Sequence, residues 1–163
     1  MSEVMRKKHL NYLFLDVSDT STPDWKRCST STDFAIAYNA NTEERDYISY
    51  ENPIDELMNY KPSIAQTQTA YIGDPIYDFV ANLARTQAVG DEAVCDCMIV
   101  RQEMNAGNTA HLAEKFPALI TIDTDDFVAK TITYTINYHG DVILGTANVV
   151  SGVPSFTADV VSV

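Results

Sequence analysis

One stretch of this chain carries a clear helix signal, and nearly every other pattern in the sequence is that of a β-strand. The apolar residues of this stretch follow the i, i+3, i+4, i+7 spacing of a helix with one apolar stripe: Ile76, Phe79, Val80 and Leu83. Gly73 permits a tight turn before them, the Asp74 carboxylate can accept from free N–H groups, and Pro75 fits the first helical position. We predict one helix over 74–86, docked on a sheet by its stripe, with Asp74, Pro75 and Phe79 as its structural residues.

Strand patterns occupy most of the remaining chain, at residues 11–17, 32–39, 44–50, 63–72, 93–104, 118–124, 130–139, 142–150 and 155–161. Asn41-Thr42 and Gly140-Asp141 are expected as turns of two hairpins, each joining the strands on either side. A short helix is expected around residues 111–115. Residues 63–72 have few apolar positions on either face, which suits a strand with one side against water or a partner's polar surface.

These patterns together predict a mainly β fold, an antiparallel β-sandwich or half-barrel with one packed α-helix. A length of 163 residues is typical of a single domain, so residues 1–163 are taken as one unit. Residues 1–10, which contain the basic cluster Arg6-Lys7-Lys8-His9, are expected to be a solvated N-terminal arm.

Residues 51–62 interrupt the strand pattern, because Pro53 and Pro62 bracket a run that allows a helical turn or two at most. A dozen residues without regular structure inside a domain usually form a functional or interacting loop. This loop carries four apolar residues: Ile54, Leu57, Met58 and Tyr60. We predict that it is an interaction loop, mobile in the isolated subunit and ordered when these side chains meet a partner.

The chain is strongly acidic, with 23 Asp and Glu against 11 Lys and Arg and a formal net charge of −12. Nucleic-acid binders gain affinity by neutralising phosphates with Lys and Arg, so ordinary DNA binding is disfavoured. Carboxylates also keep proteins soluble, so the charge alone does not define a function. No run of about 18 apolar residues and no apolar N-terminal stretch occurs, and we expect a protein made and assembled in a cytoplasm, without a membrane span.

Three cysteines, Cys28, Cys95 and Cys97, are an odd number without the spacing of a disulfide framework. Such usage fits a reducing compartment. Cys95 and Cys97 share one face of a strand and are expected as buried thiols, because a zinc site would need further ligands nearby.

No catalytic motif is present: there is no nucleophile elbow, no glycine-rich phosphate loop and no His-Glu-x-x-His. Asp123, Asp125 and Asp126 form an oxygen-rich cluster that suits Ca²⁺ or Mg²⁺, but they lack the glycine-bent loop and closing Glu of a calcium site. We predict a protein that is not an enzyme and has no cofactor or metal. A small hydrolase or a lipocalin-like binding barrel is the alternative from another class, and it would need titratable residues converging on a pocket.

Several short motifs follow one another between residues 44 and 79, namely Tyr47-Ile48, Glu51-Asn52-Pro53, Tyr60-Lys61-Pro62-Ser63 and Gly73-Asp74-Pro75-Ile76-Tyr77-Asp78. In this order and spacing they resemble the major tail tube protein of long-tailed, siphovirus-type bacteriophages of Gram-positive hosts. The resemblance continues through residues 88–93 and returns at 134–141 and 145–146, so it covers most of residues 33 to 147. Residues 123–126 lack the glycines expected between the late strands, and the first thirty residues match no motif of the family.

This resemblance implies a structural virion protein, whose homohexameric rings stack into the tail tube that delivers DNA into the host without binding it specifically. It implies a tape measure protein and tail terminator or distal tail proteins as partners, and a place in the virion tail after assembly in the host cytoplasm. The inner tube protein of a contractile tail or of a phage-derived bacteriocin particle would share this fold and ring logic and is the alternative.

In the family, each subunit lends strands to an inner barrel that surrounds an aqueous channel. Residues 130–139 alternate apolar residues with the polar set Thr131, Thr133, Thr135 and Asn137, as a lumen-lining strand requires, although a solvent-facing sheet has the same pattern. The candidate acidic residues of the lumen are Glu43, Glu44 and Asp46 early in the chain and Asp123, Asp125 and Asp126 late in it.

Overall fold

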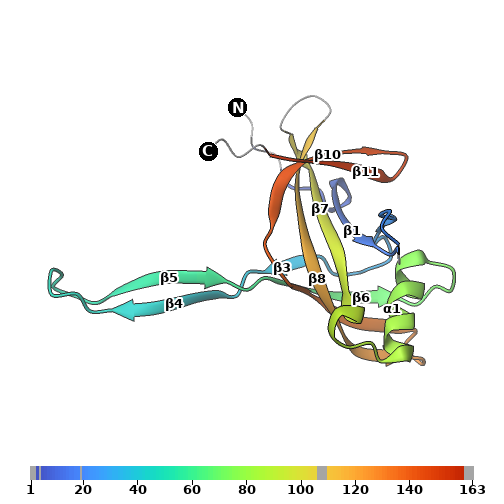
Figure 1. The fold of residues 1–163 in the computed structure, drawn as a ribbon, viewed down its shortest axis with the longest axis horizontal. Helices are drawn as coiled ribbons and strands as arrows, with labels where there is room; N and C mark the ends of the chain where they lie inside the picture. The colour runs from blue at the N-terminus through green and yellow to red at the C-terminus, as the bar shows by residue number, and fades with distance from the viewer. Residues whose placement is uncertain (1–2, 4, 19, 106–109, 160–163) are drawn as a thin grey trace.

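The computed structural model describes residues 3, 5–18, 20–105 and 110–159. Its elements in chain order are η1 (Lys8–Leu10), β1 (Asn11–Asp16), β2 (Trp25–Arg27), β3 (Ala35–Ala37), β4 (Ala40–Arg45), β5 (Ile54–Tyr60), β6 (Ser63–Thr69), α1 (Pro75–Thr86), η2 (Gly90–Ala93), β7 (Val94–Asn105), β8 (His111–Asp126), β9 (Thr131–Tyr138), β10 (Ile143–Val150) and β11 (Val153–Ala158). One curved sheet forms the body, α1 packs at one end of it, and β4 and β5 project as a long arm (Figure 1).

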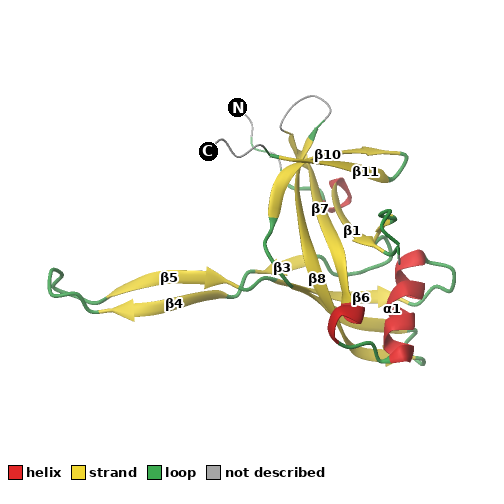
Figure 2. Ribbon diagram, viewed as in Figure 1, coloured by secondary structure: helices red, strands yellow, loops and turns green. Residues whose placement is uncertain are grey.

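The large sheet contains nine strands in the order β2-β1-β7-β8-β9-β6-β3, with β10 paired to β8 and β11 paired to β10. All of its pairings are antiparallel. Strands dominate the molecule, and α1 is the single α-helix among the residues that the structure describes (Figure 2). The predicted fold class, mainly β and antiparallel with one packed helix, is confirmed.

The longest strand, β8, pairs with two different strands along one of its edges. Its first residues pair with β10, as far as Lys115 opposite Ile143, and its later residues pair with β9, beginning at Ala118 opposite Tyr138. Pro117 lies between these two stretches. A proline has no N–H to donate, so this position, where the partner changes, loses no ladder hydrogen bond.

This arrangement contradicts the second predicted hairpin, since β9 and β10 do not pair with each other across Gly140-Asp141. The chain instead leaves β9 and joins β8 again further along. At the crossing Gly140 lies against Pro117, where a Cβ would come within 2.8 Å of the proline Cγ. The short helix expected around residues 111–115 is also wrong, because these residues begin β8 between β7 and β10.

The first predicted hairpin is wrong as well. Strand β3 pairs with β6, and β4 pairs with β5 rather than with β3. Asn39, with a φ of 50°, turns the chain between β3 and β4, and its amide donates to the Lys61 carbonyl at 3.0 Å. The two prolines expected to break residues 51–62 lie outside β5 and leave its ladder intact.

The sheet curls until residues 28–32 bridge its two sides. The Cys28 N–H donates to the Leu13 carbonyl of β1 at 2.8 Å, and the Thr32 N–H donates to the Thr67 carbonyl of β6 at 2.9 Å. Ser31 also forms an antiparallel bridge with Gln68. The short segment therefore turns an open sheet into a nearly closed half-barrel.

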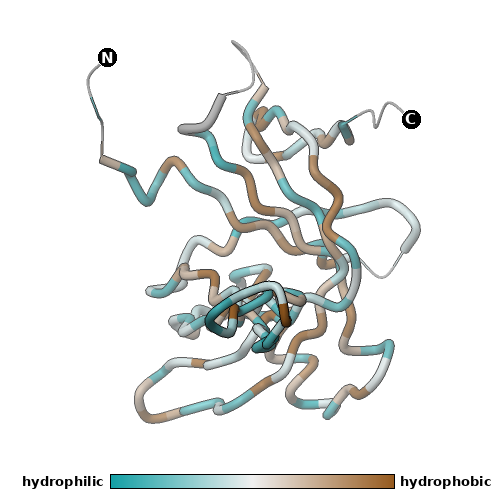
Figure 3. The backbone as a smooth tube through the Cα atoms, turned by 90° about the vertical axis from the view of Figure 1, so that its left-hand side faces the viewer, coloured by the Kyte–Doolittle hydropathy of each residue, from teal (hydrophilic) through white to brown (hydrophobic). Residues whose placement is uncertain are grey.

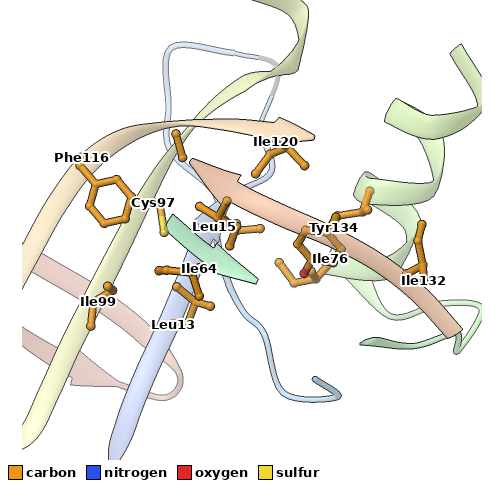
Figure 4. Close-up of a cluster of buried hydrophobic side chains, with 13 residues drawn as sticks. Leu13, Leu15, Ile64, Ile76, Cys97, Ile99, Phe116, Ile120, Ile132 and Tyr134 are labelled. Carbon is orange, nitrogen blue, oxygen red and sulfur yellow. The ribbon is translucent and has the colours of Figure 1, made fainter. Parts of the chain in front are cut away.

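The main core fills this half-barrel, and its side chains come from five strands and the helix (Figure 4). The buried members are Leu13, Leu15, Ile64, Ile76, Val80, Cys97, Ile99, Phe116, Ala118, Ile120, Ile132, Tyr134 and Ile136. A smaller core of Phe14, Met98, Val100, Ala113 and Ala147 lies on the other face, where Phe156 of β11 and Trp25 of β2 pack against it. One sheet thus buries both of its faces along β1, β7 and β8.

Helix α1 begins and packs as predicted. Asp74 is its N-cap, accepting from the Ile76 N–H at 3.0 Å, and Pro75 occupies the first helical position. Ile76 and Val80 are buried, whereas Phe79 and Leu83 are half-buried against the core. The stripe therefore docks α1 on the main core, although Phe79 is only half-buried.

Strand β6 differs from its prediction on its inward face, where Gln66 and Gln68 are buried within the barrel. The Tyr134 hydroxyl donates to the Gln68 Oε1 at 3.0 Å, and the Gln68 amide donates to the Thr30 hydroxyl at 3.0 Å. That hydroxyl donates to Asp74 Oδ2 at 2.7 Å. A chain of hydrogen bonds thus links the sheet, the bridging segment and the helix cap, which is why polar side chains are tolerated there.

We expect Asp74→Ala to destabilise the subunit more than loss of a cap alone. The cap contributes about 0.5–2 kcal/mol, and leaving the half-buried Thr30 hydroxyl without its acceptor adds about 1–3 kcal/mol. Urea denaturation should show Asp74→Asn, which retains an acceptor, losing less than Asp74→Ala, and Asp141→Ala, at an exposed carboxylate, losing almost nothing. Equal stability of Asp74→Ala and wild type would contradict the role of this network.

Candidate functional site

The most exposed part of the molecule is the arm, defined as residues 40–60, in which β4 and β5 form a two-stranded sheet of their own. Residues 51–62 were expected to lack regular structure, and the structure corrects this: residues 54–60 are strand β5, paired with β4 from end to end apart from one shift in register at Met58. Figure 3 views the molecule from the side on which the arm projects. An isolated two-stranded hairpin is marginally stable in water at best, so the arm gains from a partner.

The four predicted interface residues all lie on β5 of this arm. Leu57, Met58 and Tyr60 are each about half exposed, at 51%, 48% and 55%, while Ile54 is partly covered. The connecting turn adds an apolar tip that sequence reasoning did not assign to the interface: Tyr47, Ile48 and Tyr50. Exposed apolar residues gathered on one projecting element mark a surface suited to protein–protein contact.

Charges of the same sign face one another across the arm. In the register of β4 and β5, Glu43 lies opposite Glu56 and Glu44 lies opposite Asp55. Arg45 contacts the first pair, with Nη2 at 2.8 Å from Glu43 and Nε at 3.6 Å from Glu56. The Tyr47 hydroxyl donates to Glu56 at 2.9 Å, and this hydrogen bond raises the pKa of Tyr47.

The predicted lumen residues of β9 lie together on the outer face of the large sheet. Thr131, Thr133, Thr135 and Asn137 alternate with buried Ile132, Tyr134 and Ile136. Hydroxyl and amide groups bond across this face, from Thr135 to Asp123 Oδ2 at 3.3 Å and from the Asn137 amide to the Thr121 hydroxyl at 3.2 Å. The face is polar, and its side chains are tied to one another.

Strand β6 extends the same polar face, which sequence reasoning missed. Ser63 lies opposite Asn137, Thr67 opposite Thr133 and Thr69 opposite Thr131. The alternation of these residues with Ile64, Gln66 and Gln68 was visible as a period of two, but the glutamines concealed which side faces inward. We call the set Ser63, Thr67, Thr69, Thr121, Asp123, Thr131, Thr133, Thr135 and Asn137 the polar sheet face.

The structure does not gather the six acidic candidates in one place. Glu43, Glu44 and Asp46 are on the arm and at its turn, whereas Asp123, Asp125 and Asp126 lie at the end of β8. Asp126 accepts from the Val128 and Ala129 N–H groups at 3.0 and 2.9 Å and so shapes the turn into β9. Among the residues with described positions, no three His, Cys, Asp or Glu side chains form a group able to hold a metal ion.

A second exposed apolar area lies where β6 ends and β9 begins. Tyr71 and Ile72 follow β6, Phe127 and Val128 precede β9, and the Ala70 N–H joins the two turns by donating to the Lys130 carbonyl at 2.9 Å. Ile72, Phe127 and Val128 are more than four-fifths exposed, at 95%, 82% and 91%. The sequence showed these residues only as members of turns, so their proximity was not predictable locally.

The cysteines carry no site. Burial raises the pKa of Cys28 and of Cys95 to about 12 each and also raises the pKa of Cys97. All three thiols therefore stay protonated near neutral pH and face the main core. No helix in the described parts of the chain has the length and apolar character needed to cross a membrane.

Comparison with known proteins places this fold. A chain from the tail of an empty GTA particle, computed with helical refinement and C6 symmetry, is similar over 94% of this chain and 100% of its own, with a TM-score of 0.62 and 14% identity. The PVC sheath/tube terminator of an extracellular contractile injection system, in its extended state, covers 88% of this chain and 99% of its own, with a TM-score of 0.52 and 12% identity. No protein-family model matches the sequence, and the search of curated proteins found no match. The chain thus has the fold of subunits found in tail assemblies, and this fold extends over almost its whole length.

We expect Arg45→Gln to loosen the arm and leave the body unchanged. Removing the guanidinium leaves Glu43 and Glu56 opposite each other without a cation, and like charges directly opposite destabilise a strand pair. Hydrogen exchange of the backbone amides in β4 and β5 should become faster, while exchange in β7 and β8 stays the same. Arg85→Gln, on the exposed side of α1, is the matched control. Unchanged exchange in the arm would show that Arg45 does not stabilise it.

Proposed function

We propose that this protein is a tail tube subunit, whose homohexameric rings stack into the tube through which DNA leaves a virion. The observation that carries the proposal is the combination of a tail-assembly fold over almost the whole chain with a projecting arm that has no partner strand within the large sheet. The C6 symmetry of the GTA tail supports a ring of six. The ordered motifs between residues 44 and 79 support a siphovirus-type tail of a Gram-positive host, with the tape measure, terminator and distal tail proteins as partners and the virion tail as location.

In this proposal the arm joins subunits to one another. It exposes apolar residues on β5 and at its tip. Strands β4 and β5 pack mainly against each other and make few contacts with the strands of the body. Burying such residues against a second copy would stabilise the assembly by roughly 25 cal/mol for each Å² of apolar surface removed from water. The apolar area around Ile72 and Phe127 supplies a second contact surface for a ring, because it follows β6 and β6 runs from the arm toward α1 (Figure 1).

The polar sheet face is the surface that would line the channel. Its hydroxyl and amide groups can be hydrated, and Asp123 adds a carboxylate, so the face offers DNA phosphates no cation. Strands β8, β9 and β6 would then form this subunit's share of the inner barrel, with its apolar side turned toward the main core.

A second candidate is the inner tube or terminator of a contractile tail, which the match to the PVC sheath/tube terminator favours. Both candidates require the same ring and the same channel. A neighbouring sheath gene would distinguish them. An enzymatic function has less support, because the proteins of similar fold come from tail particles and the buried thiols are protonated.

Purified wild-type protein should form rings or tubes in negative-stain electron microscopy, and Leu57→Ser/Met58→Ser should remain soluble and unassembled. The two substitutions remove exposed apolar side chains that support no core, so the urea denaturation midpoint of the body should not change. Hydrogen exchange should show the arm amides becoming protected on assembly. Val89→Ser, an exposed apolar residue near α1, is the control. Tubes formed equally well by the double variant would remove the arm from the interface.

The channel makes a separate prediction. Counter-ions screen a charge within about 8 Å at physiological ionic strength, so carboxylates must line the wall itself to repel DNA. The surface potential of an assembled ring, calculated from experimental coordinates, should be negative at the polar sheet face. A neutral or positive wall would leave the net charge of −12 as a device for solubility.

A further inference from the structure

One face of the arm carries a pair of carboxylates without a cation. Ala40, Thr42 and Glu44 alternate along β4, and their partners across the ladder are Tyr60, Leu57 and Asp55. An irregularity in register between Asn41 and Thr42 leaves Met58 without a partner and so brings Tyr60 opposite Ala40. We call Glu44, Asp55, Leu57 and Tyr60 the open face. It is the reverse of the face on which Arg45 contacts Glu43 and Glu56.

The open face presents two kinds of group that its own subunit does not cover: acidic side chains and apolar side chains. Within the described parts of the chain, neither Glu44 nor Asp55 takes part in an ion pair, although the two lie directly opposite each other. Beside them, Leu57 and Tyr60 are 51% and 55% exposed. A partner for this face must therefore supply cations next to apolar surface.

A groove on the body has this composition. It lies between η1 and β1 on one side and β3 on the other, and has a volume of about 400 Å³ with Arg6, Lys8, Phe34, Ile36 and Ile99 in its lining. A second hollow of about 650 Å³ shares Lys8 and Phe34 with it and adds Arg27. We call the joint surface of Arg6, Lys8, Arg27, Phe34, Ile36 and Ile99 the basic groove.

The cations of the basic groove are available. Arg6, Lys8 and Arg27 form no ion pair with any residue whose position the structure describes. Arg27 is oriented by its 4.2 Å contact with the Tyr12 ring and by a 3.2 Å hydrogen bond to the His9 carbonyl. Of the 11 Lys and Arg in this acidic chain, five lie within residues 6–27: Arg6, Lys7, Lys8, Lys26 and Arg27.

In the same subunit only the base of the arm lies near this groove, where the Tyr60 ring is 6.0 Å from the ring of Tyr38 in the groove lining, because the rest of β4 and β5 projects away from the body (Figure 1). We propose that the open face of the arm docks in the basic groove of a second copy of this chain, where Glu44 and Asp55 pair with Arg6 and Lys8 while Leu57 and Tyr60 cover Phe34 and Ile36. The docking rests on the proposed self-assembly and names the surface that receives the arm. It also accounts for the basic cluster near the N-terminus, which neither the core nor the channel uses.

Charge reversal tests the pairing. Glu44→Lys/Asp55→Lys reverses the arm, and Arg6→Glu/Lys8→Glu reverses the groove at two exposed side chains outside the core. Each double variant should raise the protein concentration needed for sedimentable tubes by about tenfold or more, because like charges then meet at the contact. The variant with all four substitutions, and an equal mixture of the two double variants, should assemble near the wild-type concentration.

Asp91→Lys/Glu92→Lys makes the same change of net charge as the arm variant, at exposed positions away from the arm, and should assemble as wild type. In wild-type tubes, zero-length carbodiimide crosslinking followed by mass spectrometry should join Asp55 or Glu44 to Lys8 between copies. Failure of the four-substitution variant to recover, or normal assembly of the groove variant, would overturn the docking while leaving the tube proposal intact. A groove variant that assembles normally but loses retention of duplex DNA would assign the groove to nucleic acid instead, and a wild-type protein that never assembles would overturn both proposals.

Discussion

The Asp74 carboxylate connects the parts of this structure that the sequence places far apart. One oxygen caps α1 by accepting from the Ile76 N–H, and the other accepts from the Thr30 hydroxyl. That hydroxyl in turn accepts a hydrogen bond from the Gln68 amide. Gln68 accepts from the Tyr134 hydroxyl, and burial raises the pKa of this phenol, so it remains a donor. The helix therefore docks at the place where residues 28–32 close the half-barrel. Without this network, two glutamines inside the barrel would be costly polar groups in an apolar core.

Closure at this point organises the rest of the sheet. Because β8 is long enough to pair with β10 and then with β9, one sheet can curl toward the main core at one end and toward the smaller core at the other. The outward side of β8, β9 and β6 is left polar, and its side chains are joined by cross-strand hydrogen bonds such as that from Thr135 to Asp123. The surface proposed for the channel is thus a consequence of how the core is enclosed.

The arm is stabilised by different interactions from the body. The body is stable because it buries two cores, whereas the arm has a ladder, one arginine that offsets two carboxylates, and exposed apolar side chains. Such an element is poorly stabilised by its own subunit and gains most when another surface covers it. The division suits the proposed self-assembly, since folding of the body leaves the exposed apolar side chains of the arm available for a second copy.

Much of this molecule was determined locally by the sequence. The helix start at Gly73-Asp74-Pro75, the helix stripe, the strands β1, β7 and β9 and the mainly β antiparallel class all follow from periodicity and turn chemistry, which act between near neighbours. The ordered motifs between residues 44 and 79 also pointed to a tail protein, and the tail-assembly fold agrees with this interpretation.

Only the tertiary structure decided which strands pair. Both predicted hairpins failed because β3 pairs with β6 and because β10 pairs with the start of β8 rather than with β9. Residues 54–60 became a strand because β4 offered a ladder that the flanking prolines do not disturb. The inward turn of Gln66 and Gln68 depended on Thr30 and Asp74, which are distant in sequence. The open face and the basic groove could not be predicted from the sequence either. Whether a charged side chain has an ion-pair partner depends on which residues the tertiary structure places beside it. Strand periodicity is a local property, whereas the choice of partner depends on the free energy of the whole enclosed core.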